Sequence, residues 1–457
     1  MSTRRPTSSG SACRWRMSLS SRLVPLADAQ RRLAALVCPL APLEVPLAEA
    51  AGLVLAEDVA ATEAVPPFAC SAMDGYGIAA TGEPAPLTLK VVRRILAGDA
   101  PGEEIGPGEA VRIMTGAPLP PGADAVCMIE DSDAARDGTV AVLRHSPAPG
   151  EHVRHAGEDV AADEVVLERS TVLRARHLGV LASVGRSAVL AHRRPIVGVL
   201  STGSELVAAP APLAPGQIRD SNRHALLALV AATGANALDL GLVRDDEDLA
   251  VAAVRAGAER CDLLVTSGGV SVGDKDVVKA IIDRCCRDAE VLQVAIKPAK
   301  PLAFGRFAGG GVLIGLPGNP VSSMVSFELF VRPTIAALGG ETSPPATARA
   351  IAAEALSRSA DGKLHLVHVQ VEVDGEGRLV ARRSGGRASH LLASTVAANA
   401  LALVADGAGV PAGAMVPVLP LTGAAWPASV RPFPIEQGER VGHEVEDGLE
   451  GLDGTCC

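Results

Sequence analysis

Three glycine-rich segments between residues 200 and 323 carry hydroxyl, carboxylate and backbone N–H groups at a spacing suited to holding an oxyanion. They are LSTGSEL at residues 200–206, VTSGGVSVGDKD at residues 265–276 and GLPGNPVSS at residues 315–323. Glycines free the backbone to present successive N–H groups. In the third segment Asn319 is predicted as the N-cap and Pro320 as the first residue of a helix, whose N-terminus favours anions. Neither GxGxxG nor GxxxxGK[ST] is present, so the usual dinucleotide and P-loop sites are excluded.

Charged side chains accompany these segments. The string IKPAKP supplies Lys297 and Lys300 as cations on a loop that its prolines stiffen. Asp276 is the last residue of the second segment, just after its glycines, and a carboxylate beside a phosphate site suits a bridging Mg²⁺ to which Glu205 would add a second oxygen ligand. Each segment taken alone is equally compatible with a simple turn, so the anion site depends on their meeting in space.

The elements around these segments predict how they meet. From Pro195 to about residue 338, continuous apolar runs alternate with helical periodicity, which predicts a doubly wound, mainly parallel sheet. In such a sheet ligands bind at the carboxyl ends of the strands, where loops lead into helices. Asp245 and Asp246 precede one of these helices, at residues 247–257, and capping that helix is an equally good explanation for them.

The rest of the chain predicts further domains, giving an α/β plus β multidomain protein. An amphipathic helix at residues 26–38 is expected beside a helix that ends near Gly185. Short apolar runs separated by regular turn signals predict a small β domain, and alternation returns in the C-terminal part. The expected divisions are an N-terminal extension (1–17), a composite linking domain (18–66 and 158–194), a small β domain (67–157), the α/β domain (195–338), a C-terminal β-barrel-like domain (339–431) and an acidic tail (432–457).

Composition excludes several classes of protein. The net charge is −10 and aromatic residues make up only 2%, which disfavours nucleic-acid binding. Prolines and glycines interrupt the weakly charged stretch from residue 389 to 430, so no membrane span is expected there. Nine cysteines without zinc or disulfide spacing fit a reducing compartment, and we expect the cytoplasm.

Nine strings in this order resemble the MoeA family of molybdopterin molybdenumtransferases over roughly residues 18 to 430. They are SAMDGYG, RIMTGAPLPPGADAVCMIED, VRHAGEDV, STGSEL, GQIRDSN, RDD, TSGGVSVGDKDVVK, VAIKPAKPLAFG and GLPGNPVSS. The resemblance implies an elongated four-domain homodimer with a molybdopterin-binding α/β domain. It also implies that adenylylated molybdopterin and molybdate are converted to molybdenum cofactor with Mg²⁺-assisted release of AMP. Molybdopterin adenylyltransferase and molybdoenzyme maturation proteins are the further partners that it suggests.

Site residues follow from the same resemblance, position by position. The catalytic set is Asp74, Thr115, Asp159, Glu205, Asp245 and Asp276, with Glu205 and Asp276 as metal ligands. The substrate-binding set is Ser201, Thr202, Gly203, Ser221, Ser267, Gly268, Gly269, Ser271, Lys297, Lys300, Pro301, Pro317, Gly318, Asn319, Pro320 and Ser322. The β domain with Asp74 and Thr115 is expected to face the sheet domain of a partner subunit, so that each site is shared between two subunits.

Three positions depart from the family pattern. Gln293 stands where a basic residue is usual, Ala299 replaces a glycine of KPGKP, and His368 occupies an arginine position of the C-terminal domain. A protonated His368 is expected to bind molybdate best below about pH 6.5. Alternatives left open are a non-catalytic molybdopterin-binding scaffold, a tungstate-inserting relative, the adenylyltransferase itself and a nucleotide pyrophosphatase related to competence-damage-inducible proteins.

Overall fold

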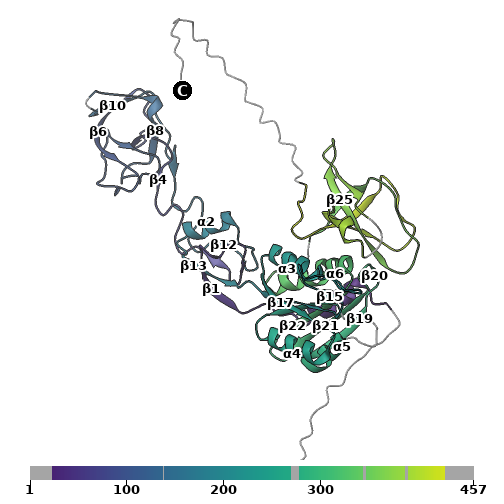
Figure 1. Cartoon of the computed structure of the whole chain (residues 1–457). Helices are drawn as coiled ribbons and strands as arrows, with labels where there is room; N and C mark the ends of the chain where they lie inside the picture. The colour runs from purple at the N-terminus through teal and green to yellow at the C-terminus, as the bar shows by residue number, and fades with distance from the viewer. Residues whose placement is uncertain (1–22, 137, 269–276, 343–345, 386–389, 428–457) are drawn as a thin grey trace, which may run out of the picture. The chain divides into compact units, whose positions relative to one another are not determined.

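The computed structural model describes residues 23–136, 138–268, 277–342, 346–385 and 390–427. Asp276, Gly269 and Ser271 of the predicted site lie outside these ranges. The chain forms two compact units, Met1–Pro345 and Ala346–Cys457. Each unit is described by itself below (Figure 1).

A six-stranded sheet forms the centre of the first unit, with strand order β17-β14-β18-β22-β21-β19. Four neighbouring strands are parallel: β17 (Asn236–Val243), β14 (Ile196–Thr202), β18 (Leu263–Ser267) and β22 (Val312–Leu316). Strand β21 (Pro301–Phe307) runs antiparallel to β22, and β19 (Cys286–Gln293) runs antiparallel to β21. The predicted doubly wound, mainly parallel sheet is confirmed.

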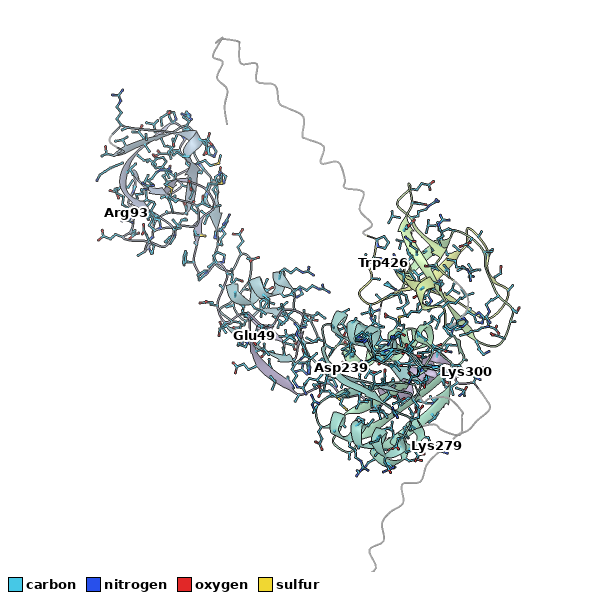
Figure 2. All side chains as sticks on the ribbon, in the orientation of Figure 1. Glu49, Arg93, Asp239, Lys279, Lys300 and Trp426 are labelled. Atoms are coloured by element: carbon cyan, nitrogen blue, oxygen red, sulfur yellow. The ribbon has the colours of Figure 1, made fainter. Side chains whose placement is uncertain are left out.

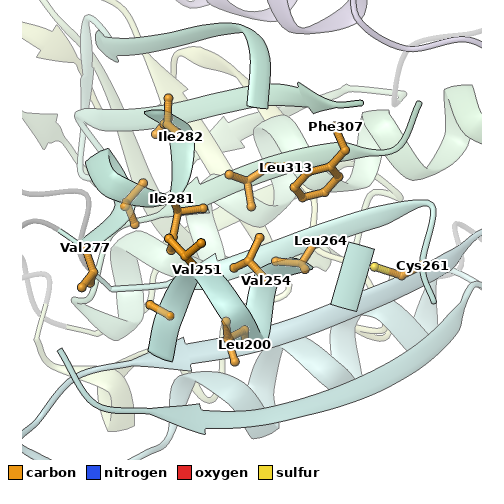
Figure 3. Packing of buried hydrophobic residues seen from close by; sticks show 13 residues of the cluster. Leu200, Val251, Val254, Cys261, Leu264, Val277, Ile281, Ile282, Phe307 and Leu313 are labelled. Atoms are coloured by element: carbon orange, nitrogen blue, oxygen red, sulfur yellow. The ribbon is translucent and has the colours of Figure 1, made fainter. Parts of the chain in front are cut away.

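Helices pack on the sheet and explain why its inner parallel strands are apolar along most of their length. On one face α4 (Glu247–Ala258) and α5 (Val277–Cys285) pack on the sheet through a cluster that includes Leu200, Val254, Leu264 and Ile281 (Figure 3). Helix α3 (Asn222–Ala232) contacts the helix that starts at residue 320. Because helices cover both faces of the inner parallel strands, β14, β18 and β22 are buried along almost their whole length and do not alternate polar with apolar residues.

The helix of residues 320–338 has three parts: α6 (Pro320–Ser326), a π-helical turn (Phe327–Val331) and α7 (Arg332–Leu338). It is the one helix of the described residues long and apolar enough to cross a membrane. However, 72% of its apolar window is buried inside the protein, as is typical of a core helix.

The first helix, α1 (Leu26–Ala34), corrects two expectations. It ends four residues before the predicted limit, and it packs against the π-helical turn and α7 instead of against α2 (Ala175–Ser183). Gln30 Nε2 donates to Leu329 O at 3.0 Å, and Arg32 pairs with Glu290 of β19 at 2.9 Å. The 3.6-residue periodicity identified the buried face of α1, but periodicity does not specify which element covers that face.

Two separate stretches build the part that follows α1. Strands β1 (Pro42–Pro46), β13 (Ala188–His192) and β2 (Val54–Leu55) form one small sheet, and β3 (Val59–Ala60) pairs with β12 (Val165–Leu167). Their buried side chains join those of α2 in one cluster. The chain therefore leaves this region and returns to it after the intervening β structure.

The intervening structure is a six-stranded sheet with order β8-β5-β7-β6-β10-β9. Its strands are β5 (Gly75–Ile78), β6 (Leu87–Ile95), β7 (Glu109–Ile113), β8 (Ala125–Met128), β9 (Ser132–Ala134) and β10 (Val140–Leu143). A short turn of 3₁₀ helix (Ile129–Asp131) follows β8, while β4 (Cys70–Ser71) pairs with β11 (Val153–Arg154). A side chain at Gly75 would place its Cβ 2.0 Å from Cys127 O, so only glycine fits at the start of β5.

The second unit is a closed barrel of five strands in the order β25-β26-β23-β29-β27, which closes because β27 also pairs with β25. The strands are β25 (Leu364–Val373), β26 (Leu379–Arg383), β23 (Ala348–Ala352), β29 (Met415–Pro420) and β27 (Ala400–Val404). Strand β24 (Leu356–Ser357) pairs with β28 (Gly409–Val410), and a 3₁₀ turn spans Leu392–Thr395. Small alanines and β-branched valines fill the interior, which suits a narrow barrel. The expected C-terminal barrel is confirmed.

Candidate functional site

The register of the central sheet brings the predicted glycine-rich segments to one edge. Ser201 at the end of β14 lies opposite Ser267 at the end of β18, and Ser267 lies opposite Leu316 at the end of β22. Antiparallel β21 begins with Pro301 at this same edge, since Ala303 pairs with Gly315. Lys300 therefore precedes β21 where the parallel strands end (Figure 2).

This edge contains the point where the strand order reverses. Strand β14 comes first in the sequence, its successor β17 lies on one side of it and β18 lies on the other. The loops after β14 and β18 consequently leave toward opposite faces of the sheet and open a crevice, which is where open α/β sheets bind ligands. Thr202, Gly203 and Gly268 line the start of these two loops.

Glycine at position 268 is required for the close approach of the two loops. Its φ is +104°, and a Cβ there would lie 2.5 Å from Thr202 O. The Gly268 N–H donates to Leu316 O at 3.1 Å, which ties the β18 loop to the end of β22 as well. The Thr202 hydroxyl is buried and has no hydrogen-bond partner among the described residues.

Asp245 and Ser204 join the loop after β17 to the loop after β14. The Ser204 N–H donates to Asp245 Oδ2 at 2.9 Å, and the Asp245 N–H donates to Ser204 Oγ at 3.1 Å. Asp246 is the residue that caps α4, because its Oδ1 accepts from Leu249 N at 2.9 Å. The capping explanation holds for Asp246, whereas Asp245 faces the strand-end loops.

A buried ion pair supports the start of α3. The side chain of Asp220 is 1% exposed and accepts from Arg223 Nε at 2.9 Å and from Ser201 Oγ at 3.0 Å. Ser201, predicted to bind substrate, thus has its hydroxyl engaged in the interior. Ser221, from the same predicted set, is the N-cap residue of α3, without a side-chain capping bond.

Asn222 was missed in the sequence, although the string GQIRDSN contains it. Its Nδ2 donates to Ser267 Oγ at 2.7 Å and to Gly318 O at 2.8 Å. Asp220 and Arg223 were missed as well. An acid three residues before an arginine at a helix start is the only local signal for them, and it is common on protein surfaces.

The segment after β22 leads directly into a helix. Pro317 and Gly318 form the turn, Asn319 is the N-cap as predicted, and Pro320 is the first helical residue. Asn319 O accepts from Ser323 N at 2.9 Å. Ser322 is almost fully buried at 5% exposure, so its side chain is not open to solvent.

The lysine segment comprises the end of β20 (Ile296–Lys297), which includes Lys297, and the loop from there to β21, which includes Lys300. Lys297 and Lys300 are exposed, and Val294 N donates to Lys300 O at 2.7 Å to close the loop between them. Ala299 is buried and has φ +75°, a left-handed conformation that favours glycine. A glycine at this position would adopt that conformation without strain.

Asp74 and Thr115 meet on the small β domain. Asp74 Oδ1 accepts from Thr115 N at 2.7 Å and from Thr115 Oγ1 at 2.8 Å. These two bonds hold the pKa of Asp74 below its usual value, and the bond from the Thr115 backbone has the larger effect. The positive charges of Arg112 and Arg94 lower this pKa further. The acid is exposed and ionised.

Asp159 and Glu205 are both exposed at their carboxylates. The Asp159 N–H donates to Val65 O at 3.0 Å, and no hydrogen bond between described residues joins its carboxylate to Asp74 or Thr115. Within the described ranges, no group of three or more histidine, cysteine or acidic side chains is arranged to hold a metal ion. The predicted metal ligand Asp276 lies outside those ranges, as do Gly269 and Ser271.

His368 lies on β25 of the barrel, where burial lowers its pKa to about 4. The imidazole is therefore neutral between about pH 4 and pH 6.5, where a protonated form was expected. Desolvation disfavours its charged form, which corrects the expectation that it binds molybdate as a cation in that range.

The fold and the site define a class of protein: an α/β domain with a crevice at the strand ends, accompanied by two β structures and a C-terminal barrel. Family models match along the chain, namely the MoeA N-terminal region (domain I and II) at residues 24–185, a probable molybdopterin binding domain at 198–337 and the MoeA C-terminal region (domain IV) at 349–421. The chain belongs to the MoeA family.

Individual relatives agree over most of their length. A molybdopterin molybdenumtransferase of Haemophilus influenzae is 39% identical over 377 residues, covering 82% of this chain and 92% of the relative. The Bacillus subtilis protein of the same name is 36% identical and covers 82% and 90%. A crystal structure of a molybdopterin biosynthesis MoeA protein from Pyrococcus horikoshii has a TM-score of 0.73, is 29% identical, and covers 87% of this chain and all of that one.

Proposed function

We propose that this protein is a molybdopterin molybdenumtransferase, which inserts molybdenum from molybdate into adenylylated molybdopterin and releases AMP. Membership of the MoeA family and the shared name of its relatives support the transferase and its place in molybdenum cofactor biosynthesis. The single observation that supports the substrate site best is the alignment of the β14, β18 and β22 ends with the lysine segment at the reversal of strand order. Backbone N–H groups and two lysines there suit a ligand with phosphate and oxyanion groups.

The residue types match the chemistry. Molybdate and the phosphoanhydride of the adenylylated pterin are both anions, so their approach requires positive charge or N–H donors that offset repulsion. Lys297 and Lys300 provide such charge at the sheet edge, while Asp74 and Thr115 provide a preformed acid and hydroxyl on the β domain. The pterin dithiolene would supply the sulfur ligands of molybdenum, and the reaction needs no covalent enzyme nucleophile.

Mg²⁺ is proposed as the metal that assists AMP release. Mg²⁺ prefers oxygen ligands and often uses only one or two protein carboxylates, completing its shell with water and substrate phosphates. The exposed carboxylate of Glu205, just after Gly203 in the crevice loop, fits that donor chemistry, and Asp276 is the second ligand that we propose. Bound there, the ion would offset negative charge on the leaving phosphate.

A homodimer and a cytoplasmic location complete the proposal. Asp74 and Thr115 belong to a domain that is distinct in sequence from the sheet edge, and we propose that they complete the site of a partner subunit. Molybdopterin adenylyltransferase would supply the substrate, and molybdoenzyme maturation proteins would receive the product.

The deciding experiment is single-turnover AMP release from adenylylated molybdopterin, with and without molybdate and Mg²⁺, in the wild type and in Asp276→Ala. Molybdate-dependent release in the wild type that the substitution abolishes supports insertion and the metal ligand together. Tight pterin binding without AMP release under any condition would instead support a non-catalytic scaffold. Equal rates with tungstate and molybdate would extend the substrate to both oxyanions.

A further inference from the structure

Four consecutive residues, Asp220 to Arg223, connect the start of α3 to every parallel strand of the sheet. Arg223 Nη1 contacts Asp239 on β17, and Asp220 accepts from Ser201 on β14. Asn222 Nδ2 donates to Ser267 on β18 and to Gly318 just after β22. We call residues 220–223 the DSNR bridge.

The orientation of the Asn222 amide follows from its partners. Gly318 O is a carbonyl oxygen and only accepts, so the atom that faces it must be the NH₂ nitrogen. The same nitrogen lies 2.7 Å from Ser267 Oγ, which therefore acts as acceptor in that bond. The Ser267 hydroxyl keeps its own proton, and no hydrogen bond within the described ranges uses it.

The two groups that Asn222 holds border the crevice. Ser267 is the last residue of β18, next to the point where strand order reverses, and Gly318 leads into the helix at residue 320. Ser267 is 2% exposed, so its hydroxyl lies at the floor of the crevice rather than on its rim. A ligand oxyanion that reaches this floor would find the free Ser267 proton already pointed away from Asn222. Such prior orientation avoids the loss of rate that small misplacements of a donor cause.

We propose that Asn222 is a positioning residue for molybdenum insertion: its amide directs the Ser267 proton toward the anionic substrate and holds the Gly318 turn beside it. This inference rests on the proposed function. The buried Asp220–Arg223 pair, with side chains 1% and 11% exposed, is the rigid base that fixes Asn222. Asn222 itself need not touch the substrate.

The test compares Asn222→Ala with Asn222→Asp in the full-length protein. An aspartate has the shape of asparagine, but its ionised carboxylate repels Gly318 O and accepts the Ser267 proton, reversing its direction. A positioning role predicts that Asn222→Asp slows AMP release about 10- to 100-fold and at least as much as Asn222→Ala. A space-filling role predicts the opposite order, with Asn222→Asp the milder change.

A double-mutant cycle with Ser267→Ala identifies the route of the effect. If Asn222 acts mainly through Ser267, the two substitutions remove the same effect. The double variant Asn222→Ala with Ser267→Ala should then release AMP no more than about threefold more slowly than the slower of the two single variants. Fully multiplicative losses would overturn the proposal. The matched control is Asn236→Ala, at the amino end of β17, where the exposed side chain makes no hydrogen bond among the described residues and AMP release should stay at the wild-type rate.

A second readout keeps this proposal separate from the proposed reaction. Molybdopterin binding, measured by calorimetry, should weaken about tenfold in Asn222→Asp, and amide exchange should rise at residues 315–323 in both Asn222 variants but not in Asn236→Ala. If the wild type releases no AMP yet these changes occur, the proposed reaction fails, and what stands is that Asn222 positions Ser267 and the Gly318 turn for molybdopterin binding. Unchanged exchange and binding in Asn222→Asp would overturn the positioning role whatever the rate of AMP release.

Discussion

At the scale of single residues, the Asp74–Thr115 pair shows how a turn sets the charge of an acid. Two donors from one threonine converge on Asp74 Oδ1, and both favour the ionised form. An acid whose folded pKa is lowered keeps its charge as pH falls until that lowered value is reached. The pair should therefore act as a carboxylate throughout the neutral and mildly acidic range.

Replacing Thr115 with valine removes the hydroxyl donor but keeps the backbone N–H and the side-chain shape. The pKa of Asp74 should rise toward its usual value, so that the carboxylate is lost at a higher pH than in the wild type. Carbon-detected NMR titration of the Asp74 carboxyl measures this directly. Thr88→Val on β6, where the threonine is exposed, is the control and should leave the titration of Asp74 unchanged.

Ala299 is a second residue whose conformation has a measurable consequence. A left-handed φ costs a non-glycine residue about 1–2 kcal/mol, and a β-branched side chain is tolerated there least. Ala299→Val should destabilise the protein by about 2–4 kcal/mol, since overpacking of this buried site adds to the strain. Ala299→Gly should stay within about 1 kcal/mol of the wild type, because relief of strain is offset by the loss of a buried methyl group.

Urea unfolding checks both variants of Ala299, with Ala295→Val as the control. Ala295 is only half-buried and lies outside the positive-φ region, so its substitution should cost less than about 1 kcal/mol. Equal losses for valine at both positions would show that the left-handed backbone is not what limits position 299.

At the scale of elements, the start of α3 depends on one buried charge pair. Asp220→Ala leaves the Arg223 guanidinium with only Asp239 as partner, and the side chain of Asp239 is 48% exposed. Removing one member of a buried pair typically costs about 3–5 kcal/mol, whereas an exposed pair contributes about 0–1 kcal/mol. Thermal unfolding should therefore show a much larger loss for Asp220→Ala than for Asp239→Ala, and similar losses would contradict a buried pair.

Sequence patterns predicted the elements better than their contacts. Continuous apolar strands in alternation with helices indicated the parallel sheet, and the position of each glycine-rich segment after a strand indicated one shared edge. The partner of α1 escaped prediction because the bond from Gln30 to Leu329 spans 299 positions, and nothing local marks it. Asn222 escaped for the same reason, since its two partners lie 45 and 96 positions away.

Some parts of the site could be predicted from physical reasoning, and others only from the family resemblance. Residues that follow strands were expected at the sheet edge from physical reasoning, but Asp74, Thr115 and Asp159 entered only through family resemblance. The structure joins Asp74 to Thr115 and Asp245 to Ser204, while Ser201, Ser267 and Ser322 prove to be buried. Burial depends on packing of distant segments, which the identity of a serine does not reveal. The assigned domain limits and catalytic roles stay predictions.

At the scale of the whole molecule, the proposed site consists of two parts on one chain: Asp74 with Thr115 on the β domain, and the crevice with Glu205 at the sheet edge. A homodimer with shared sites would pair the Asp74 of one subunit with the Glu205 of the other. A site within one subunit would instead combine Asp74 and Glu205 of the same chain. These arrangements give opposite results when two inactive variants are mixed.

Asp74→Ala and Glu205→Ala should each abolish AMP release as homodimers. In a heterodimer of the two variants, a shared arrangement gives one site with both substitutions and one with neither, so about half of the wild-type activity should return. Chains co-expressed with two different tags and purified on both give that heterodimer, and random mixing without selection should give about a quarter of the wild-type activity. If the sites lie within single subunits, each site of the heterodimer carries one substitution and stays inactive. If a heterodimer of demonstrated composition releases no AMP, the shared site is ruled out, because a shared arrangement would leave one of its two sites without a substitution.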